Sequence, residues 1–181
     1  MIDGLIPRRY AKALYKTALD HGKTNELYEV MKNVAESFRQ NPKLQKVLSN
    51  PFIKQEDKKQ LLISAAGAAA DDDYRRFVWL ILAHNREEYA YLMALSYRDI
   101  YRTENNISQV KITTASRLDD KEIEKLRQLV EKSFPNVTME FSYAVDPNLI
   151  GGFVIDVDSS RMDASISNEL KQLRQNLITT K

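Results

Sequence analysis

The segment Met139–Asp158 places the strongest constraint on the fold, because it contains two short alternating stretches separated by a turn and a glycine pair. Alternation of apolar and polar residues is the periodicity of a β-strand, and the apolar positions are Met139, Phe141 and Tyr143, then Phe153, Ile155 and Val157. Asp146-Pro147-Asn148 has the composition of a turn. Gly151-Gly152 directly precedes the second stretch, where glycine lets the backbone bend or approach another segment closely. We therefore predict two strands, an Asp-Ser-Ser turn and an amphipathic helix over Ser165–Ile178.

The chain before residue 105 has helical rather than strand periodicity. Apolar residues recur at helical spacing in segments that end at asparagine, glycine or proline. With few glycines and prolines to interrupt it, this part predicts a bundle of six helices joined by short links. The predicted helices begin at Pro7, at Thr24 or Asn25, at Asn41-Pro42, at about Gln55, with Asp71-Asp72-Asp73, and at about Glu87.

The period changes near Asn105-Asn106, where an alternating strand at Val110, Ile112 and Thr114 begins. Asp119 is then placed to cap a further helix, and the two strands and the last helix follow. We predict a mainly α chain with two domains: the six-helix bundle over residues 1–105, and a small α+β domain of order β-α-β-β-α over residues 106–181. The boundary carries no linker rich in proline, glycine or serine.

Composition excludes several classes of protein. The chain has 181 residues, no cysteine and a formal net charge of +2, so disulfides and thiol catalysis are excluded and bulk charge does not favour a nucleic-acid partner. The longest apolar run, Phe77–Ala83, is far shorter than the roughly 20 residues that a membrane span needs. The N-terminus has no secretory pattern, so we expect contact with a membrane only through a partner.

No motif for catalysis or for a cofactor stands out. Asp156, Asp158 and Ser160 suggest a calcium loop, but Arg161 and Ser167 occupy the positions that require glycine and glutamate. No Gly-Lys-Ser/Thr follows the glycine pair, so a nucleotide site is not favoured either. The two histidines lack organised partners for zinc, and acidic pairs such as Glu87-Glu88 are explained as first-turn helix charges. We expect no enzyme, no cofactor and no metal.

The first and fifth predicted helices carry more apolar surface than a bundle helix needs. A surface helix needs an apolar stripe about 100° wide or somewhat wider, whereas the first helix has apolar residues over roughly 200° and the fifth is apolar nearly all round. Either these helices are central in the bundle, or part of their apolar surface receives a partner. An amphipathic helix laid in a groove is the natural ligand for such a surface.

Two motifs at opposite ends resemble one family. Arg9-Tyr10-Ala11-Lys12-Ala13-Leu14 resembles the first-helix motif of this family, and Met139–Asp158 with the helix after it resembles its C-terminal signature. The family is that of the delta subunits of F-type ATP synthases, also called the oligomycin-sensitivity-conferring protein family. The length and the order of the two domains are also similar. The resemblance implies a non-catalytic stator subunit that joins the catalytic head to the peripheral stalk and resists rotor torque during proton-driven ATP synthesis.

The resemblance also implies partners and contact residues. The N-terminal bundle would take the amphipathic N-terminal helix of an alpha subunit between the first and fifth helices, and the C-terminal domain would engage the C-terminal ends of the b subunits. The expected alpha-subunit contacts are Tyr10, Ala11, Leu14, Tyr15 and Ala18, with Val78, Trp79 and Leu82 opposite. The expected b-subunit contacts are Leu170, Leu173, Leu177 and Ile178, with core packing as the rival explanation for each.

The same resemblance implies a peripheral location on the cytoplasmic side of the bacterial inner membrane, with no nucleic-acid partner. Two alternatives remain open at this point. One is a helical adaptor or regulatory protein, unrelated to the synthase, that binds an amphipathic helix in the same groove. The other is an enzyme whose site is too dispersed to recognise.

Overall fold

A computed structural model describes residues 4–133 and 137–179, with the side chains of Ala69 and of residues 176–179 left out of the description. The chain divides into two compact units, Met1–Glu104 and Asn105–Lys181. This division lies one residue before the boundary that the change of period predicts. The described part is mainly helical with one four-stranded sheet, and each unit is considered by itself.

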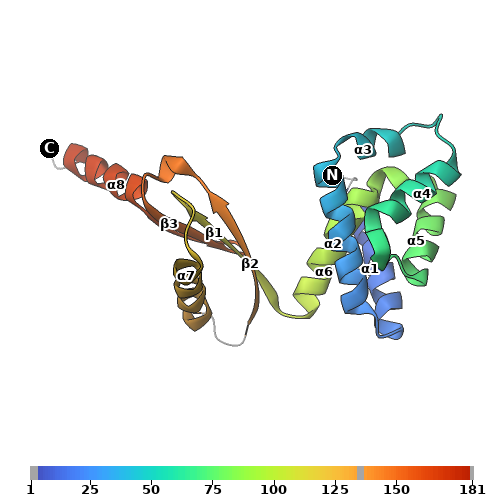
Figure 1. Cartoon of the computed structure of the whole chain (residues 1–181), viewed down its shortest axis with the longest axis horizontal. Coiled ribbons are helices and arrows are strands. Elements are labelled where there is room, and N and C mark those ends of the chain that lie inside the picture. The colour runs from blue at the N-terminus through green and yellow to red at the C-terminus, as the bar shows by residue number, and fades with distance from the viewer. Residues whose placement is uncertain (1–3, 134–136, 180–181) are drawn as a thin grey trace. The chain divides into compact units, whose positions relative to one another are not determined.

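The first unit consists of α-helices joined by short links (Figure 1). A single turn of 3₁₀-helix follows the fourth helix at Gly67–Ala69, and another at Glu87–Tyr89 precedes the sixth, so the sixth helix begins later than predicted. The helices are α1 (Leu5–Asp20), α2 (Thr24–Gln40), α3 (Lys43–Leu48), α4 (Gln55–Ala66), α5 (Asp72–Ala83) and α6 (Ala90–Glu104).

The core of this unit forms where α6 packs against α1 and α2, and where α4 packs against α2 and α5. Two tyrosines are fully enclosed there and satisfy their hydroxyls on backbone carbonyls. The Tyr74 hydroxyl donates to the Leu62 carbonyl at 2.9 Å, and the Tyr97 hydroxyl donates to the Thr24 carbonyl at 3.2 Å. Burial raises the pKa of both phenols well above the usual range, because a phenolate would lose its hydration. These hydroxyls therefore stay protonated and act as fixed links between helices.

The second unit is a mixed sheet with two helices. Its elements are β1 (Ile107–Thr114), α7 (Asp120–Ser133), β2 (Thr138–Val145), a 3₁₀ turn (Pro147–Leu149), β3 (Gly152–Val157), β4 (Ser160–Ser165) and α8 (Ile166–Thr179). The strand order is β2-β1-β3-β4. The β1 and β2 strands are parallel and are connected through α7, whereas β3 is antiparallel to both β1 and β4.

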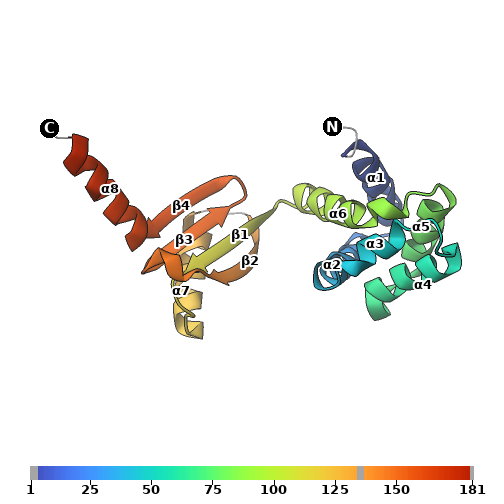
Figure 2. The ribbon, with the colours of Figure 1, turned by 90° about the horizontal axis from the view of Figure 1, so that it is seen from above.

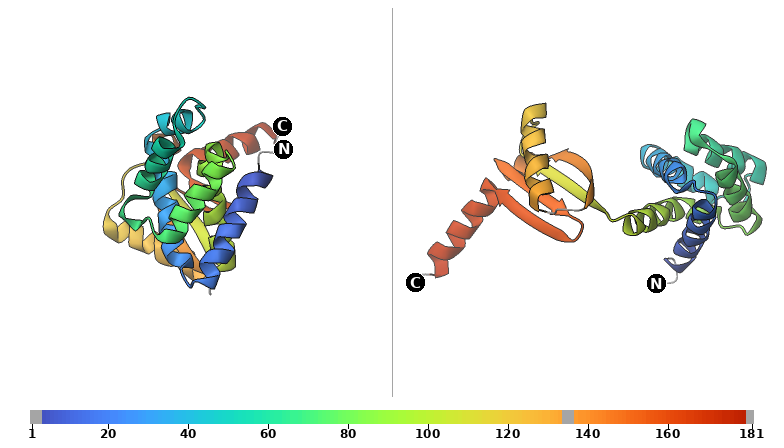
Figure 3. Two further views of the ribbon diagram at one scale, coloured as in Figure 1. Left: turned by 90° about the vertical axis from the view of Figure 1, so that its right-hand side faces the viewer. Right: turned by 90° about the horizontal axis from the view of Figure 1, so that it is seen from below.

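The register places apolar residues of three strands on one face of the sheet. Val110 pairs with Phe141 on β2 and with Val157 on β3, and residues paired in register point to the same face. The helix α7 covers this face (Figure 3) and contributes the buried Val130. As predicted, Asp119 caps α7: its carboxylate accepts from the amide of Glu122 at 2.7 Å. The small core of this unit therefore lies between α7 and the centre of the sheet.

The predicted order β-α-β-β-α is wrong in one element, because β4 follows the Asp-Ser-Ser turn and makes the order β-α-β-β-β-α. Most of β4 is exposed at the sheet edge, so its polar sequence lacks the strand alternation that would reveal it. The turn itself forms a hairpin, with Asp158 at a φ of 48°. The Asp158 carboxylate also accepts from the amide of Gln109 at 2.9 Å, which ties the hairpin to β1.

Candidate partner-binding site

A furrow of about 390 Å³ runs between α1 and α5. Its apolar surface comes from α1 and α5, and the side chains of Arg9 and Arg86 lie beside that surface. The lining residues are Ile6, Arg9, Tyr10, Ala13, Leu80, His84 and Arg86. The furrow thus lies between the two helices that the sequence identifies as too apolar.

Ring and backbone contacts fix one end of the furrow. The Tyr10 ring packs edge-on against the His84 ring, with centroids 6.4 Å apart and an interplanar angle of 71°. His84 Nδ1 lies 2.9 Å from the Leu80 carbonyl, which holds the imidazole close to the end of α5. Tyr10 is half-buried, so one side of its ring packs on the protein and part of it remains available.

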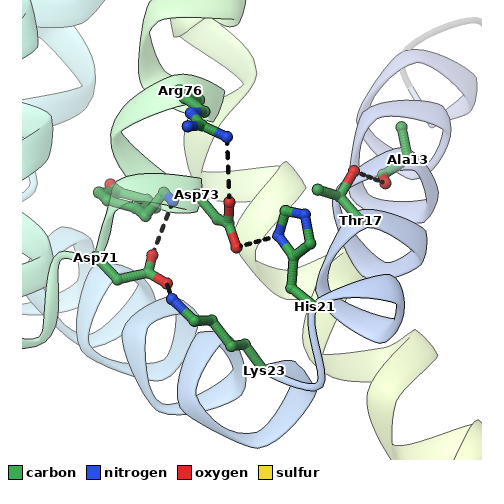
Figure 4. Close-up of polar contacts among 8 residues, drawn as sticks. Ala13, Thr17, His21, Lys23, Asp71, Asp73 and Arg76 are labelled. Carbon is green, nitrogen blue, oxygen red and sulfur yellow. Dashed lines mark hydrogen bonds and ion pairs between the residues drawn. The ribbon is translucent and has the colours of Figure 1, made fainter.

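A polar cluster fixes the opposite end of the same helix pair (Figure 4). His21 Nδ1, just after α1, lies 2.7 Å from an oxygen of the buried Asp73 carboxylate in the first turn of α5. Lys23 contacts Asp71 at 3.4 Å, and Asp71 caps α5 by accepting from the amide of Tyr74 at 2.9 Å. Because both ends are tied, α1 and α5 are held at a fixed spacing and the furrow is preformed.

The furrow is cationic as well as apolar. Arg9 and Arg86 line it, and neither guanidinium forms an ion pair with another residue in the described part of the chain. Ile6 and Leu80 supply apolar surface beside these guanidinium groups. A ligand that matches this surface needs apolar side chains along one face and carboxylates beside them, which is the pattern of an acidic amphipathic helix.

The structure corrects the predicted lining of the furrow. Of the eight predicted residues, five are enclosed in the bundle's own core: Ala11, Leu14, Ala18, Val78 and Leu82. They belong to the cluster of buried side chains that forms the core of this unit, so they leave almost no surface for a partner. Tyr10 does line the furrow. Trp79 is 65% exposed on α5, while Tyr15 is half-buried against the Tyr97 ring at 5.8 Å.

Sequence reasoning missed several furrow residues. Arg9 and Ala13 are one helical turn apart on α1, and Leu80 has the same spacing from His84, the residue that follows α5. This spacing places each pair on one face of its helix and could have indicated the lining of the furrow. An apolar arc does not identify these residues, however, because several of them are small or charged.

The α8 helix presents a separate apolar stripe. Ile166, Leu170 and Leu173 follow the spacing i, i+4, i+7 and are 44%, 53% and 59% exposed. Core packing is thereby excluded as the role of Leu170 and Leu173. The side chains of the other two predicted contacts, Leu177 and Ile178, lie outside the described residues. No helix in the described part of the chain is long and apolar enough to cross a membrane.

Comparisons with known proteins identify the class of this chain. Residues 6–177 match the sequence model of the family described as ATP synthase delta (OSCP) subunit. A relative from Phocaeicola vulgatus, named ATP synthase subunit delta, is 38% identical over 98% of this chain and 96% of its own length. A relative of the same name from Parabacteroides distasonis is 38% identical over 97% of each chain.

A solved structure shares the fold. A chain of the Toxoplasma gondii mitochondrial ATP synthase superposes with a TM-score of 0.72 over 95% of this chain and 97% of that chain, at 14% identity. The protein described here belongs to the ATP synthase delta (OSCP) subunit family. It is accordingly a non-catalytic, structural subunit of the stator, or peripheral stalk, of ATP synthase. Family membership sets aside the adaptor unrelated to the synthase and the enzyme with a dispersed site.

Proposed function

We propose that this subunit clamps the catalytic head to the peripheral stalk by binding one helical partner with each unit. The α1–α5 furrow holds the amphipathic helix at the N-terminus of an alpha subunit, and α8 engages the C-terminal ends of the b subunits. The assembly works during proton-driven synthesis on the cytoplasmic side of the bacterial inner membrane, where this subunit contacts the membrane only through the complex.

The observation that carries the first contact is the preformed furrow, whose apolar surface lies beside the Arg9 and Arg86 guanidinium groups, neither of which has an ion-pair partner among the described residues. Resistance to torque requires slow dissociation, and slow dissociation requires buried apolar area rather than exposed ion pairs. Burial contributes about 25 cal/mol per Å² before the costs of association are subtracted. A preformed furrow lowers those costs, because few side chains of the clamp need to be ordered on binding.

Leu80→Asp is expected to weaken binding of the alpha-subunit N-terminal peptide by roughly 10–100-fold, which is the effect of losing one buried leucine contact. Leu80 lines the furrow and is only partly buried by its own chain, so helix content should be retained. Isothermal titration calorimetry measures the affinity, and circular dichroism reports the helix content. The fluorescence of Trp79, the single tryptophan, should change on titration of the peptide into the unsubstituted protein.

Leu19→Asp is the matched control for Leu80→Asp. Leu19 is 60% exposed on α1 but lies outside the α1–α5 furrow, so its substitution should leave peptide affinity within about threefold of the unsubstituted value. Equal losses in the two variants would show that the peptide does not use the furrow. Full affinity of the Leu80→Asp variant would contradict the proposed head contact.

The stalk contact has its own test. Leu173→Asp is expected to lower the affinity for a soluble C-terminal segment of the b subunit by roughly 10–100-fold, because it puts a carboxylate in the middle of the apolar stripe. Sedimentation of the mixed full-length subunit and b segment measures the association. Leu129→Asp is the control, because Leu129 is 47% exposed on α7 and lies outside the stripe. An unchanged affinity of the Leu173→Asp variant would exclude α8 from the stalk contact.

A further inference from the structure

Ile150 adopts a backbone conformation that its side chain makes unfavourable. Its φ of 65° and ψ of −39° lie between the left-handed helical region and the strained form of the γ-turn. A positive φ is rare for any residue with a Cβ, and it is a true outlier for a β-branched one. Of the residues with positive φ in the described part of the chain, only Ile150 is β-branched, the others being asparagine, aspartate or glycine.

Packing within the unit does not explain why isoleucine occupies this position. The residue is 67% exposed, so most of its apolar surface faces solvent. A glycine or asparagine would adopt the same backbone with less strain and would expose no apolar surface. Strained residues of this kind cluster at active sites, ligand clamps and switch regions, so this outlier directs attention to a functional role.

A concavity of about 540 Å³ adjoins Ile150 at the end of the sheet where β1 ends and β3 begins. Its apolar lining includes Leu118, Leu126 and Phe153. A second hollow of about 310 Å³ shares Thr114 and Leu118 with it. That second hollow is lined by two more exposed apolar side chains, Tyr143 at 48% and Val145 at 53%.

The concavity is continuous with the apolar stripe of α8. The amide of Ile166 donates to the Gly151 carbonyl at 3.1 Å, so α8 begins beside Ile150. The Ile166 side chain lies directly over Gly151, since a Cβ on that glycine would be 2.5 Å from Ile166 Cδ1. Figure 2 shows α8 leaving the sheet at this corner. A helix lying along Leu173, Leu170 and Ile166 would therefore reach Ile150 and the concavity next.

The mouth of the concavity carries one available positive charge. Lys125 lines it and forms no ion pair with another described residue. Glu122 also lines the concavity, and its carboxylate is held at the start of α7, where it accepts from the amide of Asp119 at 3.1 Å. A matching ligand thus offers an apolar side chain with a carboxylate beside it.

We propose that this corner, defined as Ile150, Gly151, Lys125 and the apolar lining of the concavity, receives the end of the stalk helix that lies on α8. The proposal rests on the stalk contact proposed above. An apolar side chain of that helix enters the concavity against Ile150, and a carboxylate beside it contacts Lys125. Ile150 is retained in a strained conformation because its side chain serves the partner, not the fold of its own unit.

Ile150→Gly tests this role with two readouts of opposite sign. We expect the thermal unfolding midpoint of the full-length subunit to rise, because the strain is released, and the affinity for the b-subunit segment to fall at least about tenfold, because the anchor is removed. Ile150→Leu keeps an apolar side chain and is expected to bind within about threefold of the unsubstituted protein. Both quantities are measured on the full chain, by differential scanning calorimetry and by sedimentation with the b segment.

The outcomes separate this inference from the proposed stalk contact. If Ile150→Gly binds the b segment normally and Leu173→Asp does not, the proposed role of the corner is wrong, while α8 remains the stalk contact. A lower unfolding midpoint for Ile150→Gly would also overturn it, because the isoleucine would then be serving its own unit. Unchanged binding by both variants would reject the stalk contact itself.

Discussion

Gly152→Ala is expected to destabilise the second unit by roughly 3–5 kcal/mol, combining the cost of a positive φ for a residue with a Cβ and the cost of overpacking. Gly152 has a φ of 74°, and a Cβ there would lie 2.2 Å from the Ala164 carbonyl oxygen. That oxygen belongs to the backbone of β4, which pairs with β3 through Gly152 and Ser165. The conflict can be relieved only by separating the two strands, so α8, which starts directly after Ser165, loses its anchor as well.

Gly151→Ala is the matched control for this prediction. A Cβ at Gly151 also meets an atom at short distance, but that atom is Cδ1 of Ile166, the end of a side chain that can rotate away. Its φ is not positive, so we expect a loss of about 1 kcal/mol or less. Hydrogen exchange at the β3 and β4 amides measures the stability of this unit, while exchange at the amides of α1 and α6 reports that the first unit is intact. Equal losses in the two variants would contradict the backbone conflict.

Most of the fold could be predicted because its elements carry strong periodic signals. The first helix ends next to a glycine, as predicted for these segments: Gly22 follows α1 at a φ of 67°. The fifth helix starts at the predicted acidic run, where the Asp71 carboxylate caps α5. β3 begins and ends where the alternation does. β4 could not be predicted, because an edge strand exposed on most of its length needs no apolar alternation.

The location of the site could be predicted better than its residues. Excess apolar surface on the first and fifth helices predicts a surface for a partner there, and the structure has a furrow between these two helices. However, when apolar residues cover a wide arc of a helix, their pattern does not show which part of the arc faces the core. Leu14 and Tyr10 are one helical turn apart on α1, yet the structure leaves Leu14 only 5% exposed while Tyr10 is half-buried. That difference depends on the neighbouring helices, which the sequence pattern does not specify.

Glu87 shows the same limit for a charged residue. The sequence explains it as a charge in the first turn of a helix, but the structure places it in a 3₁₀ turn and pairs it with Lys58 of α4 at 2.6 Å. The two side chains are only 10% and 5% exposed. Such a contact, between residues distant in the chain, has no periodic signature.

Glu87→Ala is expected to destabilise the bundle by roughly 3–5 kcal/mol, the cost of breaking a buried ion pair. The Lys58 ammonium would remain enclosed with no compensating charge, and returning it to solvent would require α4 to move from the α5–α6 connection. Urea denaturation followed by circular dichroism measures the loss. Glu29→Ala removes an ion pair to Lys32 whose side chains are both 52% exposed, so it is expected to change stability by no more than about 0.5 kcal/mol.

Replacing both members of the buried pair tests why Glu87→Ala is harmful. One Glu87 oxygen, Oε2, is buried without a hydrogen-bond partner among the described residues, so the pair is already incompletely satisfied. Apolar side chains of similar size remove both the desolvation cost of the buried charges and the unpaired charge that Glu87→Ala leaves. Lys58→Met combined with Glu87→Leu should therefore recover at least half of the stability that Glu87→Ala loses. A double variant as unstable as Glu87→Ala would mean that the ion pair itself holds α4 against the α5–α6 connection, and that the desolvation argument is wrong for this site.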